Sequence, residues 1–292
     1  MTTTTQLSLL RYEIDGKGIA TLWLQSEERP VVVLDRNLIQ RLNTTLDAIE
    51  QEADITAIFL RSDCKRVFVA GADLAEINAL DDPSLHAYLA FGTTVFGRLA
   101  SLPYPTVALI NGATLGGGLE IAMHCDAMVA SRVGGNGKPY QIGLPEAGLG
   151  LCPGWGGTQM LPARIDPSTA IEASATGTLF SSDSIPDGLV DCLVETPEEL
   201  QDAANTWLDA NPTVKRSIPR CIESTSGAYS EALDVARSNT GDTESAQSVV
   251  LAVETGIQRG WAEAVAVEQC ELVRLRSTPL AVKKLEAFLS RG

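Results

Sequence analysis

The sequence is poor in histidine and lacks the motifs of a histidine-activated nucleophile. Only His86 and His124 occur among the 292 residues, and neither lies near a Gly-x-Ser-x-Gly elbow, which is absent. Hydrolysis by a serine or cysteine nucleophile is therefore not expected, and both histidines are predicted to be surface or partly buried helix residues. The six cysteines are scattered without a Cys-x-x-Cys pair, so reduced thiols and no metal site are expected.

Positive charge is also scarce. Lysine and arginine number 22 against 37 acidic residues, which gives a formal charge of −15 and disfavours binding to nucleic acid or to an anionic membrane surface. Residues 1–6 lack the basic and apolar regions of a secretory signal. The longest uncharged run, residues 102–119, contains prolines and glycines and does not read as a membrane span. A soluble, cytoplasmic protein is expected.

The hydrophobic pattern alternates between short apolar runs and helical spacing, which predicts an α/β fold with a parallel sheet. Strands are predicted at residues 7–14, 19–24, 56–60, 107–110, 127–130 and 189–194. A helix is predicted after Asp35, because apolar residues recur at positions 38, 42, 46 and 49. Beyond residue 195 the pattern is helical, with a break at Pro279.

Two strand-turn-helix units, residues 106–120 and 140–159, each carry a carboxylate, Glu120 and Glu146. Three glycines, 116–118, stand where the first helix begins. Glycines there allow either close packing of helix on strand or binding of an anionic oxygen by unpaired N–H groups. The residues alone leave both readings open.

A further glycine turn in residues 67–74 ends another apolar strand, and Asp73 is placed to cap the helix that follows. N–H groups from two such strand ends could form an oxyanion hole beside the two glutamates. That arrangement would suit chemistry through an enolate.

Four segments stand in a fixed order along the chain: Phe-Val-Ala-Gly-Ala-Asp at 68–73, Gly-Gly-Gly-Leu-Glu at 116–120, Leu-Pro-Glu at 144–146 and Pro-Gly-Trp-Gly-Gly-Thr-Gln at 153–159. Together they resemble the crotonase, or enoyl-CoA hydratase/isomerase, superfamily. The resemblance implies a crotonase-like ββα spiral core over residues 1–195. It also implies a C-terminal helical region, 196–292, that forms a homotrimer or hexamer and completes the acyl-CoA site.

The resemblance assigns roles to individual residues. The N–H groups of Ala72 and Gly117 would hold the thioester oxygen, Glu120 would activate water, and Glu146 would protonate the α-carbon. Coenzyme A would enter only as part of the substrate, with no tightly bound cofactor. Residues expected to contact it are Ala70, Asp73, Leu74, Arg29, Lys65, Arg66 and, from a neighbouring subunit, Lys283 or Lys284. Trp155 and Gly154 are expected in the acyl pocket.

These roles predict an enoyl-CoA hydratase, similar to those of fatty-acid β-oxidation. An isomerase that shifts a double bond remains open, as does a bifunctional enzyme, because Trp155 resembles the aromatic residue of fused β-oxidation enzymes. A non-catalytic binding protein is a third reading, although the basic surface of RNA-binding homologues is absent. The glycine-rich loop at residues 133–140 and the insertion of Ala163 depart from the usual pattern, and the loop could reshape the pocket wall.

Overall fold

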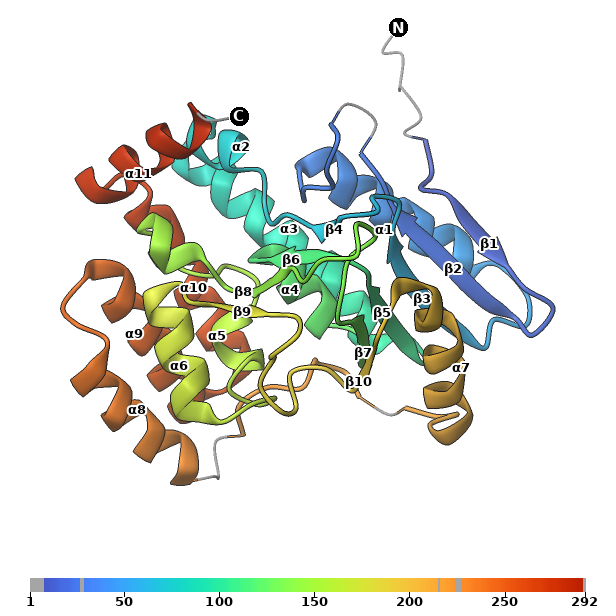
Figure 1. The fold of residues 1–292 in the computed structure, drawn as a ribbon. Helices are drawn as coiled ribbons and strands as arrows, with labels where there is room; N and C mark the ends of the chain where they lie inside the picture. The colour runs from blue at the N-terminus through green and yellow to red at the C-terminus, as the bar shows by residue number, and fades with distance from the viewer. Residues whose placement is uncertain (1–7, 27–28, 215, 224–226, 291–292) are drawn as a thin grey trace, which may run out of the picture.

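The computed structural model describes residues 8–26, 29–214, 216–223 and 227–290. Two sheets and a set of helices make up this part of the chain (Figure 1). The larger sheet contains, in spatial order, β1 (Tyr12–Ile14), β2 (Ile19–Leu24), β3 (Ala57–Ser62), β5 (Thr106–Ile110), β7 (Ala127–Ser131) and β10 (Cys192–Val194). The smaller sheet contains β4 (Val67–Val69), β6 (Ala113–Leu115), β8 (Gln141–Gly143) and β9 (Leu179–Ser181).

The larger sheet is parallel from β2 to β10, and only β1 runs antiparallel, as the partner of β2. This confirms the predicted N-terminal hairpin, although its first strand is shorter than the predicted 7–14, and Leu7 lies outside the described residues. Strands β5 and β7 are buried along their whole length, as expected for parallel strands covered on both faces.

Each central strand of the larger sheet is followed by a strand of the smaller sheet and then by a helix. The bounds of the helices are α1 (Arg36–Glu50), α2 (Leu74–Ala79), α3 (Asp82–Ser101), α4 (Gly117–Met123), η1 (Glu146–Leu149), α5 (Gly157–Met160), α6 (Pro167–Thr176), η2 (Pro197–Glu199), α7 (Leu200–Ala210), α8 (Gly227–Asn239), α9 (Glu244–Arg259), α10 (Trp261–Leu275) and α11 (Pro279–Leu289). The successions β3-β4-α2, β5-β6-α4 and β7-β8-η1 confirm the predicted ββα units.

Helix α1 illustrates how local sequence sets an element. The Asp35 side chain accepts a hydrogen bond from the Leu38 N–H at 2.7 Å, which satisfies one of the free donors of the first turn. The apolar residues at positions 38, 42, 46 and 49 are all buried. The predicted helix and its start are therefore confirmed.

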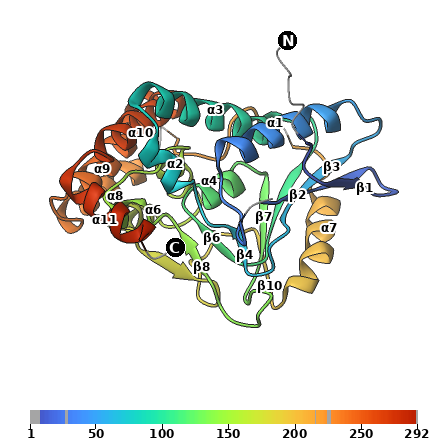
Figure 2. The ribbon, with the colours of Figure 1, turned by 90° about the horizontal axis from the view of Figure 1, so that it is seen from above.

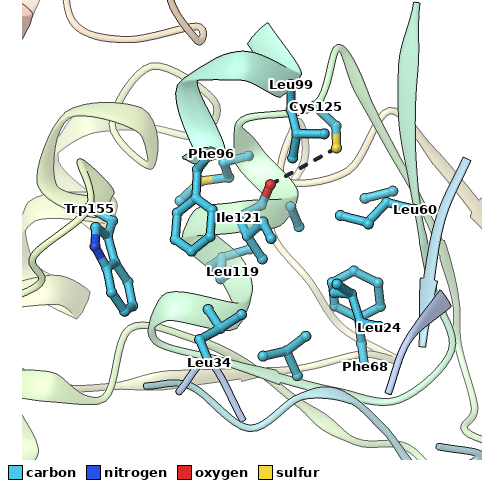
Figure 3. Packing of buried hydrophobic residues seen from close by; sticks show 14 of the residues in the cluster. Leu24, Leu34, Leu60, Phe68, Phe96, Leu99, Leu119, Ile121, Cys125 and Trp155 are labelled. Carbon is cyan, nitrogen blue, oxygen red and sulfur yellow. Dashed lines mark hydrogen bonds between the residues drawn. The ribbon is translucent and has the colours of Figure 1, made fainter. Parts of the chain in front are cut away.

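Helix α4 lies at the centre of the largest hydrophobic core. Its Leu119 and Ile121 pack among side chains from both sheets and from α3, including Leu60, Phe68 and Phe96 (Figure 3). All seven residues of α4 are buried. A helix without a solvent-exposed face needs close approaches to its neighbours, and its glycines permit them.

The C-terminal helices α8 to α11 gather on the side of the molecule away from the β1-β2 hairpin (Figure 1). Helix α10 packs along α3, and α6 packs on α8 and α9 (Figure 2). Helix α7 instead covers β5 and β7 of the larger sheet. The predicted domain boundary at residue 195 stays a prediction. Helix α7 follows that residue in sequence, yet it packs against the sheet of the predicted core and not with the other C-terminal helices.

The loop at residues 133–140 packs beside the β3-β4 connection, where the Gly135 N–H donates to the Lys65 carbonyl at 2.9 Å.

Among the described residues, no helix combines the length and the apolar character required to cross a bilayer.

The approach of α4 to β4 yields a test of the packing. A Cβ at Gly118 would lie 2.3 Å from the Val69 carbonyl oxygen, whereas a Cβ at Gly97 of α3 would meet nothing within 4 Å. Gly118→Ala should therefore lower the free energy of unfolding by about 1–3 kcal/mol. Gly97→Ala is the matched control and should raise it by about 0.5–1 kcal/mol, because alanine favours a helix interior. Chemical denaturation of both variants would measure this, and equal effects would contradict the close approach.

Candidate active site

Glu120 and Glu146 line one cavity of about 350 Å³, although they lie 26 positions apart in sequence. Glu120 lies on α4, which starts where β6 ends, and Glu146 is the first residue of η1, just after β8. Neighbouring parallel strands of the smaller sheet thus deliver the two carboxylates to the same place. The rest of the lining is mostly apolar.

Glycine is required between the two carboxylates. Gly116 adopts φ +52°, a conformation that other residues rarely tolerate. A Cβ there would also lie 2.3 Å from Glu146 Oε1. The glycine run at the start of α4 therefore serves close approach of the backbone to the second carboxylate, as well as the packing of helix on strand.

The Glu120 carboxylate is held by the backbone before and within α5. The N–H groups of Trp155 and Gly157 donate to its Oε1 at 2.8 and 2.9 Å. The residue is 1% exposed. Burial raises the pKa of Glu120 to about 7, and the two N–H donors partly oppose that rise because they stabilise the charged form.

Glu146 has a different environment. Its Oε2 is buried and has no hydrogen-bond partner among the described residues. Burial, followed by the nearby charges of Glu120 and Glu268, raises the pKa of Glu146 well above its ordinary value. The rise favours the protonated form of Glu146, whereas Glu120 titrates near neutral pH.

Ala72 and Gly117, predicted as the oxyanion hole, line the same cavity. Gly117 is the first residue of α4, so its N–H has no acceptor within the helix. Beyond β4, Leu34 forms a parallel bridge with Ala72. That bridge uses the Gly71 carbonyl and the Asp73 N–H, so the Ala72 N–H is not engaged in it.

Trp155 and Gly154, predicted in the acyl pocket, also line the cavity. The indole of Trp155 is 2% exposed and donates from Nε1 to the Leu89 carbonyl at 3.0 Å. A Cβ at Gly92 would lie 2.4 Å from the indole, and one at Gly117 would lie 2.5 Å from it. The ring is therefore a fixed part of the wall between Gly92 of α3 and Gly117 of α4. It also lies edge-on beside Phe96 (Figure 3).

Only some of the residues predicted to contact coenzyme A line the cavity. Ala70 and Leu74 line the cavity. Asp73 instead caps α2 and pairs with Arg29 at 2.6 Å. Lys65 is exposed on the β3-β4 connection together with Arg66, apart from the cavity lining.

Lys283 and Lys284 lie on α11, which packs on α2 and η1 of the same chain. Helix α11 also contributes Phe288 to the cavity lining, and α10 contributes Leu272. The C-terminal helices therefore reach the cavity within one chain. None of residues 133–140 lines it.

Two features of the site were not predicted. Glu268 of α10 is fully buried and accepts hydrogen bonds from the segment that holds Glu120. Its position with Ala264, Val265 and Leu272 on the buried face of α10 was the available signal, because a charged residue on an apolar helix face calls for a partner.

His124 was expected at the surface or partly buried, and that expectation is wrong. It is 0% exposed, with Nδ1 2.9 Å from the Glu120 carbonyl oxygen and its ring edge-on to Phe96 and Trp261. Burial lowers the pKa of His124 to about 4. The neutral ring therefore acts as packing behind α4.

A family model described as Enoyl-CoA hydratase/isomerase matches residues 16–255. The chain therefore belongs to the enoyl-CoA hydratase/isomerase family, and the predicted crotonase fold is confirmed. Membership defines a class of CoA-thioester enzymes that includes both hydratases and isomerases.

Solved structures agree with this fold. An enoyl-CoA hydratase from Bacillus halodurans is 23% identical with a TM-score of 0.67, over 96% of this chain and 100% of that chain. A human mitochondrial delta3-delta2-enoyl-CoA isomerase is 23% identical with a TM-score of 0.69, over 97% and 98%. A carnitinyl-CoA dehydratase from Mycobacterium thermoresistibile is 17% identical with a TM-score of 0.72, over 96% and 89%. At these identities the similarity establishes the fold only. The reaction has to be inferred from the residues of the site.

The raised pKa of Glu120 predicts how stability depends on pH. The ordinary value is 4.5 and the folded value about 7, so the folded chain keeps a proton that the unfolded chain releases in this range. The contribution of protonated Glu120 to the free energy of unfolding is therefore complete below pH 4.5 and is lost as pH rises through 7. Glu120→Gln cannot lose a proton, and its amide oxygen can still accept both N–H bonds. Relative to wild type, the variant should gain on the order of 3 kcal/mol between pH 4.5 and 8.

Urea denaturation across that pH range would measure the gain. Glu172→Gln, on the exposed face of α6, is the matched control and should follow the wild-type curve. Parallel curves for wild type and Glu120→Gln would contradict the assignment of a raised pKa to Glu120.

Proposed function

We propose that this chain hydrates trans-2-enoyl-CoA thioesters to 3-hydroxyacyl-CoA. The observation that carries the proposal is the pair of buried carboxylates at one apolar cavity. Glu120 has a pKa of about 7, and Glu146 has a pKa well above its ordinary value. A base and an acid are therefore available together, which is what addition of water across a double bond requires.

In the proposed reaction, ionised Glu120 takes a proton from water as the water oxygen bonds to the β-carbon. The π electrons of the double bond move toward the thioester carbonyl and give an enolate oxygen. Protonated Glu146 then gives its proton to the α-carbon as the carbonyl reforms. Glu120 ends protonated and Glu146 ionised, so one proton must pass back before the next cycle.

The N–H groups of Ala72 and Gly117 are the proposed donors to the enolate oxygen. Both residues line the cavity, and neither N–H is used by the helix or the bridge beside it. One such donor contributes on the order of 3 kcal/mol of transition-state stabilisation in enzymes with an oxyanion hole. Because both donors are backbone groups, substitution of side chains would not remove them directly.

An isomerase is the second candidate. Shifting a double bond needs one carboxylate to remove a proton and return it to another carbon, and Glu146, with its unpartnered Oε2, is suited to that. Glu120 would then be dispensable. A bifunctional enzyme would use both carboxylates for hydration and Glu146 alone for isomerisation.

We also propose a trimer-based assembly, either a trimer or a hexamer. Four apolar side chains of α11 are exposed in the isolated chain: Leu280, Val282, Phe288 and Leu289. Exposed apolar side chains on a terminal helix favour contact with a second copy. The phosphates of coenzyme A would meet Lys283 and Lys284 on the same helix.

The lysine proposal can be tested by Lys283→Gln/Lys284→Gln. Exposed ion pairs contribute about 0.2–1 kcal/mol each, so loss of two should raise KM for crotonyl-CoA about twofold to thirtyfold with little change in kcat. Lys17→Gln/Lys138→Gln removes the same charge from exposed sites elsewhere and should not raise KM. Crotonyl-pantetheine lacks the nucleotide phosphates, so with this substrate the variant and the wild type should have the same KM. If the variant raised KM by the same factor for crotonyl-pantetheine as for crotonyl-CoA, the assignment would be refuted.

The two carboxylates can be separated by Glu120→Gln and Glu146→Gln, each assayed for hydration of crotonyl-CoA and for shift of a 3-enoyl-CoA double bond. For a hydratase, each substitution should lower kcat for hydration by about 10²–10⁴-fold, because each removes a proton-transfer group. For an isomerase, Glu120→Gln should spare the double-bond shift and Glu146→Gln should abolish it.

Glu172→Gln serves again as the exposed control and should retain parental rates. Loss of the ultraviolet absorbance of the conjugated thioester reports hydration. If Glu120→Gln hydrated crotonyl-CoA at the parental rate, the two-carboxylate mechanism would be ruled out. If the wild type turned over no enoyl-CoA thioester of any acyl chain length, a non-catalytic binding protein would be favoured.

A further inference from the structure

Glu268 is a third buried carboxylate beside the proposed catalytic pair, contributed by α10. Its Oε2 accepts from the Gly156 N–H at 2.6 Å, and its Oε1 accepts from the Thr158 N–H at 2.9 Å. The Thr158 hydroxyl also donates to Oε1. The side chain is not among those that line the cavity, so it does not meet the substrate directly.

Successive backbone N–H groups of residues 155–158 donate alternately to two carboxylates. The N–H groups of Trp155 and Gly157 point to Glu120, and those of Gly156 and Thr158 point to Glu268. The segment is thus held from both sides, with α4 on one side and α10 on the other. A displacement on the Glu268 side would displace the donors on the Glu120 side as well.

Helix α10 fixes this segment at a second point. Gly156 adopts φ +95° and lies against Trp261, whose ring would be 2.1 Å from a Cβ at position 156. A packing role alone would not need a charge in α10, because a buried carboxylate costs free energy unless donors compensate it. The three donors at Glu268 offset only part of that cost, because burial and the nearby charge of Glu120 still raise the pKa of Glu268 to about 8. The role that remains for this side chain is to orient the donors.

From this arrangement we propose that Glu268 is a positioning residue, which acts through residues 155–158 to set the place and orientation of the Glu120 carboxylate. The inference rests on the proposed function in assigning Glu120 to the chemical step. It extends that function to a residue 148 positions further along the chain. Loss of the correct acceptor at Glu268 should therefore impair catalysis through Glu120, with a smaller effect on substrate binding.

Glu268→Gln tests this with nearly constant volume. One carboxylate oxygen becomes an NH₂ group, which must face an N–H donor of Gly156 or Thr158, so the segment should shift. We expect kcat for hydration to fall about 10–100-fold, since misplacement of a catalytic group by about 1 Å has effects of that size, and KM to change less than kcat. Glu271→Gln is the matched control: it lies one turn along α10 and contacts Arg274 and Ser248 instead.

A double-mutant cycle distinguishes positioning from general support of the fold. If Glu268 acts through Glu120, Glu120→Gln/Glu268→Gln should be as slow as Glu120→Gln alone, because the group being positioned is already lost. A further fall in the double variant, by the same factor that Glu268→Gln causes in wild type, would overturn the proposal. So would a kcat for Glu268→Gln equal to that of Glu271→Gln.

Amide hydrogen exchange gives a readout that needs no substrate. In Glu268→Gln the amides of Trp155 and Gly157, which do not bond to Glu268, should exchange about tenfold faster, because loss of one hydrogen-bond set loosens the other. Wild-type protection at both amides would overturn the inference. An inactive wild type would overturn only the proposed function, and the exchange result would still decide the positioning role.

Thr158→Val provides a milder variant that does not depend on the folding of Glu268→Gln. It removes the hydroxyl donor to Glu268 and keeps the N–H, so a fall in kcat and faster exchange at Trp155 are expected. Thr158→Ser keeps the hydroxyl and should restore both. Equal behaviour of the valine and serine variants would count against the proposal.

Discussion

Compensation of buried negative charge by backbone N–H groups is the constraint on which the rest of the site depends. A carboxylate removed from water without partners is costly, and its pKa rises until it takes a proton. Glu120 and Glu268 receive donors from one short segment, residues 155–158, whereas Glu146 receives none at Oε2. The backbone path between η1 and α5 therefore decides which carboxylates receive donors, while burial raises the pKa of all three.

The same constraint explains where glycine is needed. A backbone N–H can approach a buried carboxylate only if no side chain intervenes, and Gly157 would place a Cβ 3.0 Å from Glu120 Oε1. At Gly116 the close approach involves no such bond, since its N–H donates to the Gly143 carbonyl, but a Cβ there would lie 2.3 Å from Glu146 Oε1. A Cβ at Gly117 would collide with the indole of Trp155. The glycine-rich stretches are thus the points where the chain passes between the carboxylates and the apolar wall.

Local patterns predicted much of the fold. Asp35 before α1, the apolar runs of β5 and β7, and the break at Pro279 each depend on neighbours in sequence, so the sequence alone could reveal them. Glu120 and Glu146 followed from the resemblance together with their place after strands. The burial of His124 was mispredicted, because it depends on α3 and α10 closing over the end of α4.

Glu268 shows why the remainder of the site escaped sequence reasoning. Its partner Thr158 is 110 residues away, and no local pattern states which loop a buried acid on α10 will meet. In the proposed mechanism, the proton-transfer chemistry therefore depends on the C-terminal helices. Helices α10 and α11 supply Leu272 and Phe288 to the cavity, and α10 also fixes the donors that hold Glu120. Family membership alone leaves the reaction open, because burial raises the pKa of both Glu120 and Glu146 and the donors that oppose this rise at Glu120 come from a segment distant in sequence.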